Sequence, residues 1–93
     1  MNLISNPIKR IENLDTLNQL NNLNLDSNKI QIIEGLDKLI NLNYLHLNNN
    51  QIREIPKELS TLINLQELNL SDNQITEIPK ELIHLPIKLK TIY

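Results

Sequence analysis

The chain has 93 residues, which is enough for one domain, and a chain of this size buries only a thin globular core. Its net charge of −2, with nine basic residues interspersed among eleven acidic ones, argues against a nucleic-acid-binding surface. Cysteine is absent, which excludes disulfides and thiolate chemistry, and no apolar run approaches the roughly 20 residues of a membrane helix. The N-terminal stretch lacks a signal-peptide pattern, so we expect an intracellular, cytoplasmic protein.

The apolar residues come from a narrow set, because Leu and Ile dominate while Val, Phe and Trp are missing. A core of so few side-chain shapes indicates that the same packing arrangement recurs along the chain. Four asparagines support this reading, since Asn6, Asn28, Asn50 and Asn73 are separated by 22, 22 and 23 residues. The same apolar frame surrounds three of them: Leu20, Leu23, Leu25, Asn28, Ile30 and Ile33; then Leu42, Leu45, Leu47, Asn50, Ile52 and Ile55; then Leu65, Leu68, Leu70, Asn73, Ile75 and Ile78.

The repeats divide the chain in order. The first repeat is incomplete and contributes Leu3, Asn6, Ile8 and Ile11, and a fifth repeat begins with Leu89 and Ile92. We therefore predict a single domain over residues 1–93, made of a partial repeat over 1–19, complete repeats over 20–41, 42–64 and 65–88, and a truncated repeat over 89–93.

Each repeat contains two kinds of spacing. The Leu-x-Leu part alternates with period two, which predicts a short strand with its leucines on one face. After the asparagine the apolar spacing loosens to about three residues, which favours a helical or 3-10 return segment. Pro56 and Pro79 fit the first turn of such a segment, where a missing N–H costs nothing. Successive strands would then lie parallel, about 4.8 Å apart, in an α/β solenoid.

The pattern LxxLxLxxNxI resembles the leucine-rich repeat family over essentially the whole chain. Residues 55–59 and 78–82 read Ile-Pro-Lys-Glu-Leu, similar to the family's variant with a proline in its convex segment. Residues 11–14 and 33–36 are closer to its 22-residue variant. The resemblance implies a right-handed superhelix with a concave parallel sheet and short helical or 3-10 convex segments. It also implies a non-catalytic module that binds a partner protein on the concave face.

The registered asparagines have a structural explanation. Where the strand turns sharply, backbone groups lose their ladder partners, and a buried polar group without a hydrogen bond costs roughly 1–3 kcal/mol. An asparagine amide has both donors and an acceptor, so a column of Asn6, Asn28, Asn50 and Asn73 is predicted to bond the turns of its own and the adjacent repeat. Asn49, between Asn48 and Asn50, is expected to be a solvated turn residue.

The candidate binding residues are the non-leucine positions of the strands. Tyr44 and His46 stand out, since they lie on one face of a central strand about 6.6 Å apart, and tyrosine is enriched among residues that contribute binding energy. An ordinary surface role for both is the competing interpretation. Equivalent positions of successive strands form columns on this face, and Thr91 and Tyr93 are expected to continue the columns of Glu67 and Asn69. His84 is expected to be solvated on the return segment. The predicted partner-binding set is Asn24, Asp26, Tyr44, His46, Asn48, Glu67 and Asn69.

Catalysis is not expected. Asp26, His46 and Ser71 lie on consecutive predicted strands, but their staggered positions leave about 8 Å between backbones, too far for a hydrogen-bonded triad. The sequence contains no phosphate-binding loop and no cluster with metal-ligand spacing, so neither a cofactor nor a metal is expected. The alternative function is that of a structural or self-associating solenoid segment, in which exposed sheet edges would stack end to end. A fragment of a larger repeat protein is a further alternative.

Overall fold

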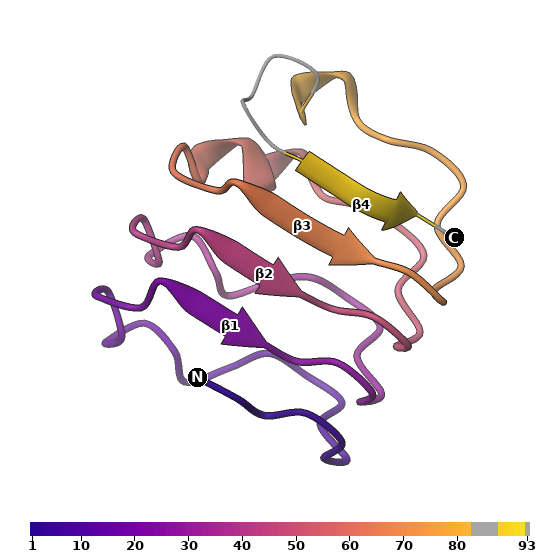
Figure 1. Cartoon of the computed structure of the whole chain (residues 1–93), viewed down its shortest axis with the longest axis horizontal. Coiled ribbons are helices and arrows are strands. Elements are labelled where there is room, and N and C mark those ends of the chain that lie inside the picture. The colour runs from indigo at the N-terminus through magenta and orange to yellow at the C-terminus, as the bar shows by residue number, and fades with distance from the viewer. Residues whose placement is uncertain (83–87, 93) are drawn as a thin grey trace.

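The computed structural model describes residues 1–82 and, by their backbone, residues 88–92. Within these residues, four strands form one parallel sheet in the order β1-β2-β3-β4 (Figure 1). The strands are β1 (Asn22–Asn24), β2 (Tyr44–His46), β3 (Glu67–Leu70) and β4 (Lys88–Ile92). The predicted solenoid with a parallel sheet is confirmed. The predicted positions of His84 and Tyr93 lie outside the described residues.

The register of the first three strands follows from their leucines. Leu23 pairs with Leu45, which pairs with Leu68, and all three are fully buried. Their neighbours on each strand point away from the core, because successive side chains of a strand alternate between its faces. One row therefore holds Asn22, Tyr44 and Glu67, and the next holds Asn24, His46 and Asn69.

The first residues of the chain extend the sheet beyond β1. Asn2 forms a parallel bridge with Asn24, the Leu3 N–H donates to the Asn24 carbonyl at 2.8 Å, and the Asn24 N–H donates to the Met1 carbonyl at 2.9 Å. The Asn2 position thus continues the row of Asn24, His46 and Asn69.

At β4 the register differs from the prediction. The sequence aligned Leu89 and Ile92 with the Leu-x-x-Leu start of a repeat, which placed Thr91 beside Glu67. The structure instead pairs Lys88 with Glu67, Leu89 with Leu68, and Ile92 with Leu70, with an irregularity between the last two pairs. Leu68 and Leu70 are two residues apart on β3, whereas their partners Leu89 and Ile92 are three residues apart on β4. The one extra residue of β4 produces the irregularity, as in a β-bulge.

The core is built from only two residue types. Every buried apolar side chain among the described residues is Leu or Ile, and they form one continuous cluster through the coils. Full burial of one such side chain contributes roughly 1.5–3 kcal/mol. Equivalent leucines stack from coil to coil, so the core grows by repetition and each coil packs mainly on its neighbours.

The return segments are of two kinds. In the two later coils they form the 3-10 helices η1 (Lys57–Thr61) and η2 (Lys80–Leu82). Pro56 lies at the N-cap of η1 with ψ of 142°, so it precedes the helix and is not in its first turn as predicted. The extended ψ explains the difference, because the proline carbonyl accepts the first bond, from the Leu59 N–H.

The two earlier coils have no helix in their return segments. They return through turns in which the Leu17 and Leu39 N–H groups donate to the carbonyls three residues before them. Asn13 and Gly35, at equivalent positions, adopt φ of 63° and 67°, in the left-handed region. Both residues immediately precede these turns, which begin at Leu14 and Leu36, and a left-handed backbone there interrupts a helical path into the turn.

An asparagine closes the turn that follows each of the first three strands. The Asn50 amide donates to the carbonyls of Leu47 and Asn48 in its own coil and of Leu25 in the preceding coil, at 3.1–3.2 Å. Its Oδ1 accepts the Ile30 N–H of the preceding coil at 3.0 Å. Asn28 and Asn73 repeat this arrangement. The side chain of Asn6 is exposed and donates to its own turn, at Leu3 and Ile4.

The residue before each of these asparagines has an unusual backbone conformation. Ser5, Ser27, Asn49 and Asp72 adopt φ of 60°, 59°, 56° and 57°. Asn and Asp tolerate the left-handed region better than most residues do. Asn49 is exposed and contributes to the turn through its left-handed backbone. Asn50 contributes through its buried side chain.

We expect the Asn50→Ala substitution to lower the free energy of unfolding by about 1–3 kcal/mol, because it leaves buried backbone groups of two coils unpaired. Asn50→Asp should also destabilise the fold, since it keeps the shape but loses the amide donors. Urea denaturation measures both effects. The control is Asn22→Ala, at an exposed position, and equal midpoints for this control and Asn50→Ala would contradict the structural role.

Candidate functional site

The predicted concave face corresponds to the side of the sheet that points away from the core. We call it the open sheet face. Its side chains come from β1, β2, β3 and the residues just after them, and in the described part of the chain they are mostly small and polar. They are Asn22, Asn24, Asp26, Tyr44, His46, Asn48, Glu67, Asn69 and Ser71.

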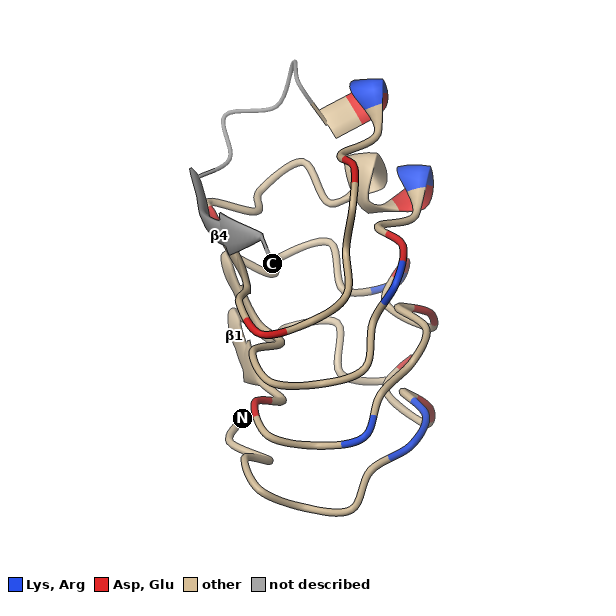
Figure 2. Cartoon of the chain, turned by 90° about the vertical axis from the view of Figure 1, so that its right-hand side faces the viewer, with Lys and Arg blue, Asp and Glu red and all other residues tan. Residues whose placement is uncertain are grey.

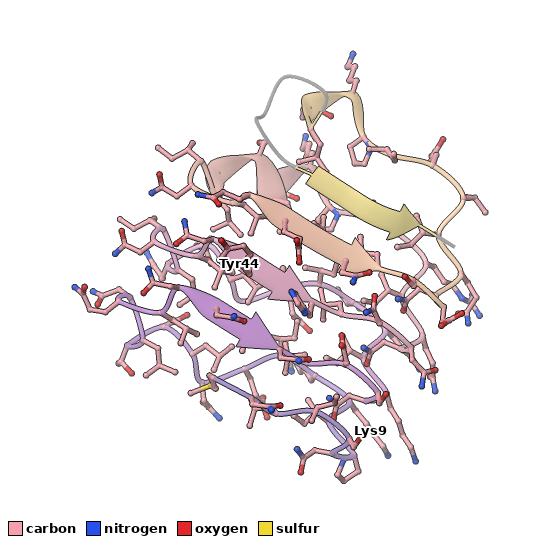
Figure 3. All side chains as sticks on the ribbon, viewed as in Figure 1. Lys9 and Tyr44 are labelled. Carbon is pink, nitrogen blue, oxygen red and sulfur yellow. The ribbon has the colours of Figure 1, made fainter. Side chains whose placement is uncertain are left out.

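Tyr44 is the largest exposed apolar group on this face. It begins β2, between Asn22 on β1 and Glu67 on β3 (Figure 3), and is 38% exposed. Its hydroxyl donates to Gln66 Oε1 at 3.4 Å, a long hydrogen bond that leaves the ring accessible. The ring therefore offers an apolar surface with a polar tip, a combination that is common at protein interfaces.

His46 and Glu67 lie together beside Tyr44. The His46 Nε2 is 3.1 Å from Glu67 Oε2, and the two side chains are 26% and 22% exposed. The distance fits an ion pair, but the Nε2 atom is shielded from solvent and its geometry is not that of a hydrogen bond. We therefore treat the contact as electrostatic, with a full charge pair only when the imidazole is protonated. Both side chains are in contact with each other, so they offer a partner less exposed surface than Tyr44 does.

Asp26 and Asn48 have structural roles that the sequence did not indicate. Asp26 Oδ1 accepts the backbone N–H of Asn48 at 2.7 Å, and Asn48 Oδ1 accepts that of Ser71 at 2.9 Å. Each side chain thus binds the equivalent position of the next coil. These two predicted partner-binding residues therefore also hold the coils together where the strands end.

Asn24 and Asn69 form shorter contacts along their own strands. Asn24 Oδ1 accepts the Asp26 N–H at 3.0 Å, and Asn69 Oδ1 accepts the Ser71 hydroxyl at 3.1 Å. Both side chains are half-buried. The partner-binding role of all seven residues stays a prediction, and Tyr44 is the one whose exposed surface is least used within the sheet.

A second set of asparagines, which the sequence analysis missed, lies where the coils enter their strands. The Asn41 amide donates to the Asn18 carbonyl at 2.8 Å, and the Asn64 amide donates to the Ile40 carbonyl at 2.9 Å. The Asn43 amide donates to the Asn64 carbonyl at 3.0 Å. The signal for two of them was present in the sequence, because Asn41 and Asn64 immediately precede the equivalent leucines Leu42 and Leu65.

Asp26, His46 and Ser71, which the sequence spacing placed too far apart for a triad, each have other partners. Asp26 accepts the Asn48 N–H, His46 contacts Glu67, and the Ser71 hydroxyl donates to Asn69. Within residues 1–82 and 88–92, no three His, Asp or Glu side chains are grouped closely enough to hold a metal ion. In the same residues, no helix has the length and apolar character needed to cross a membrane.

Residues 40–84 match the family model described as leucine-rich repeats in two copies. The chain carries leucine-rich repeats. The comparison with curated proteins gave no match.

Solved leucine-rich repeat structures resemble the chain closely. Internalin C2 from Listeria monocytogenes is 31% identical, with a TM-score of 0.82, and the match covers 96% of this chain and 40% of that one. An internalin, InlF, from the same organism is 32% identical, with a TM-score of 0.76, over 83% of this chain and 22% of that one. A chain of the Drosophila melanogaster SNF/U2A' complex is 29% identical, with a TM-score of 0.75, over 92% and 57%. The match spans less than two thirds of each of these proteins.

We expect Asp26→Ala to lower the free energy of unfolding by about 1–2 kcal/mol, because it removes the charged acceptor of the Asn48 N–H. Asp26→Asn should stay close to the unsubstituted protein, since Asn48 already shows that an amide oxygen serves at the equivalent position. Urea unfolding curves of the two variants test this. An Asp26→Ala variant as stable as the unsubstituted protein would show that Asp26 has no such structural role.

Proposed function

We propose that the chain binds a partner protein on its open sheet face, without catalysis. Leucine-rich repeat proteins are in general non-enzymatic interaction modules, and one similar structure is of a complex, that of SNF and U2A'. The observation that supports the face is Tyr44, a half-exposed aromatic ring at the start of a central strand, surrounded by short polar side chains. An aromatic group in such surroundings is a typical hot spot of a protein interface.

The chemistry of the face indicates the kind of partner. Asn22 and Asn24 flank the β2 residues with amide groups that both donate and accept hydrogen bonds. Glu67 adds a carboxylate that is already in contact with His46. The face thus suits a partner that places an apolar group against Tyr44 and bonds the surrounding amides. The intracellular location of this chain stays a prediction from the sequence.

We expect Tyr44→Ala to lower capture of a partner from an extract of the native cells by about tenfold or more, because the ring would supply most of the apolar contact. The unfolding midpoint should barely change, since the side chain is exposed. The matched control is Lys57→Ala, an exposed residue of η1 on the opposite side of the coils. Quantitative mass spectrometry of the captured proteins provides the measurement. Capture that survives Tyr44→Ala would place the interface elsewhere.

Self-association is the second candidate function, and the edge formed by residues 1–5 favours it. This segment bonds β1 through Asn2 and Leu3, while Met1 and Ile4 are 47% and 44% exposed. An extended segment with accessible apolar side chains at the edge of a sheet can pair with another chain. A second copy could therefore add its own sheet to this edge.

Light scattering at several protein concentrations tests the second candidate. If the edge associates, the mean mass should rise with concentration, and an Ile4→Lys substitution should suppress the rise by placing a charge at the edge. Ile32→Lys is the control, because Ile32 is 62% exposed but lies on a return segment. A constant monomer mass would exclude self-association at the concentrations measured.

A further inference from the structure

The convex side of the solenoid, formed by the return segments, changes shape between its second and third coils. In the second coil two residues separate Ile33 from Leu36, and the left-handed Gly35 makes this path tight. In the third coil three residues separate Ile55 from Leu59, and the chain forms η1. η1 packs beside η2, so the two later coils match each other (Figure 2). The change in repeat length therefore produces a step beside Gly35.

A groove with a volume of about 310 Å³ lies at this step. It is lined by Gly35 and Pro56 and, at its base, by the apolar residues Ile33, Leu36, Leu59 and Leu62. A space of this size is at the lower limit of small-molecule sites. It is therefore suited to one long side chain of a partner.

All the charged residues that line the groove are acidic, namely Glu34, Asp37 and Glu58. Glu34 Oε2 lies 3.3 Å from Arg10 Nε, so this carboxylate is partly neutralised. Asp37 and Glu58 are exposed and form no ion pair within residues 1–82. Lys38 and Lys57 are their neighbours in sequence but are not part of the lining. The groove thus combines an apolar base with a rim of net negative charge.

We propose that this groove binds an arginine or lysine side chain from a basic segment of a partner protein. These side chains have an aliphatic stem that can lie on Leu36 and Leu59, and a cationic head that can reach Asp37 and Glu58. Arginine fits better, because its guanidinium is more weakly hydrated and pairs with carboxylates in a fixed geometry. This second surface lies on the convex side and is independent of the proposal for the open sheet face.

The proposal is tested by titrating the ¹⁵N-labelled protein with two capped tripeptides, Leu-Arg-Leu and Leu-Gln-Leu, and following the amide signals by NMR. The arginine peptide should shift the signals of Gly35, Asp37 and Glu58. The glutamine peptide should bind at least fivefold more weakly, because it cannot form the one or two solvent-exposed ion pairs that the arginine peptide forms. Added salt should weaken the arginine peptide's binding selectively.

Two double variants with the same change in net charge complete the test. Asp37→Asn with Glu58→Gln should weaken binding of the arginine peptide by about fivefold. Asp15→Asn with Glu77→Gln is the matched control and should leave binding unchanged, because Asp15 occupies the position equivalent to Asp37 one coil earlier. The Tyr44→Ala variant should also bind the peptide normally.

Several results would overturn the proposal. They are equal binding of the two peptides, equal loss in the two double variants, or no shift at the highest peptide concentration. Signal changes confined to Tyr44 and His46 would instead place the basic segment on the open sheet face.

Discussion

The structure depends on how one side-chain amide satisfies the backbone where each strand turns. At Asn50 the amide donates to two carbonyls of its own coil and one of the preceding coil, and accepts the Ile30 N–H in return. A carboxylate would lack the donors, and an apolar side chain would leave all of these groups unpaired. Because the bonds connect two coils, they also fix how one coil sits on the next. The alignment of Leu45 between Leu23 and Leu68 is consistent with this constraint.

The same type of bond recurs at the surface, where it limits what the open sheet face can offer a partner. Asp26 and Asn48 each bind the backbone of the following coil, and His46 is in contact with Glu67. These side chains are part of the scaffold as well as of the face. Tyr44 differs, since its one hydrogen bond is long and its ring is accessible. Polar side chains that are already held by hydrogen bonds are pre-organised for a partner, which reduces the entropy lost on binding.

The two repeat lengths affect the two sides of the solenoid differently. Both lengths return the chain to the same register at the strands, because the leucines of β1, β2 and β3 pair in the same way. The extra residue is absorbed on the convex side, where Pro56 precedes a 3-10 helix and Gly35 precedes a turn. Gly35 also lies close to the preceding coil, since a Cβ at this position would be 3.2 Å from the Ile11 carbonyl oxygen. The convex side can therefore vary in shape while the register of β1, β2 and β3 stays the same.

The sequence by itself determined the repeat period, the strands, the buried leucines and the solenoid, because these follow from local spacing and the alternation of side chains along each strand. It also indicated Tyr44 as the exposed aromatic residue of a central strand. Only the tertiary structure decided which partners the polar side chains find. The bond from the Asn48 N–H to Asp26, the contact of His46 with Glu67, the register of Leu89 at β4 and the acidic groove beside Gly35 all join residues about 20 positions apart. Their geometry depends on how two coils are placed against each other, which the spacing within one coil does not specify.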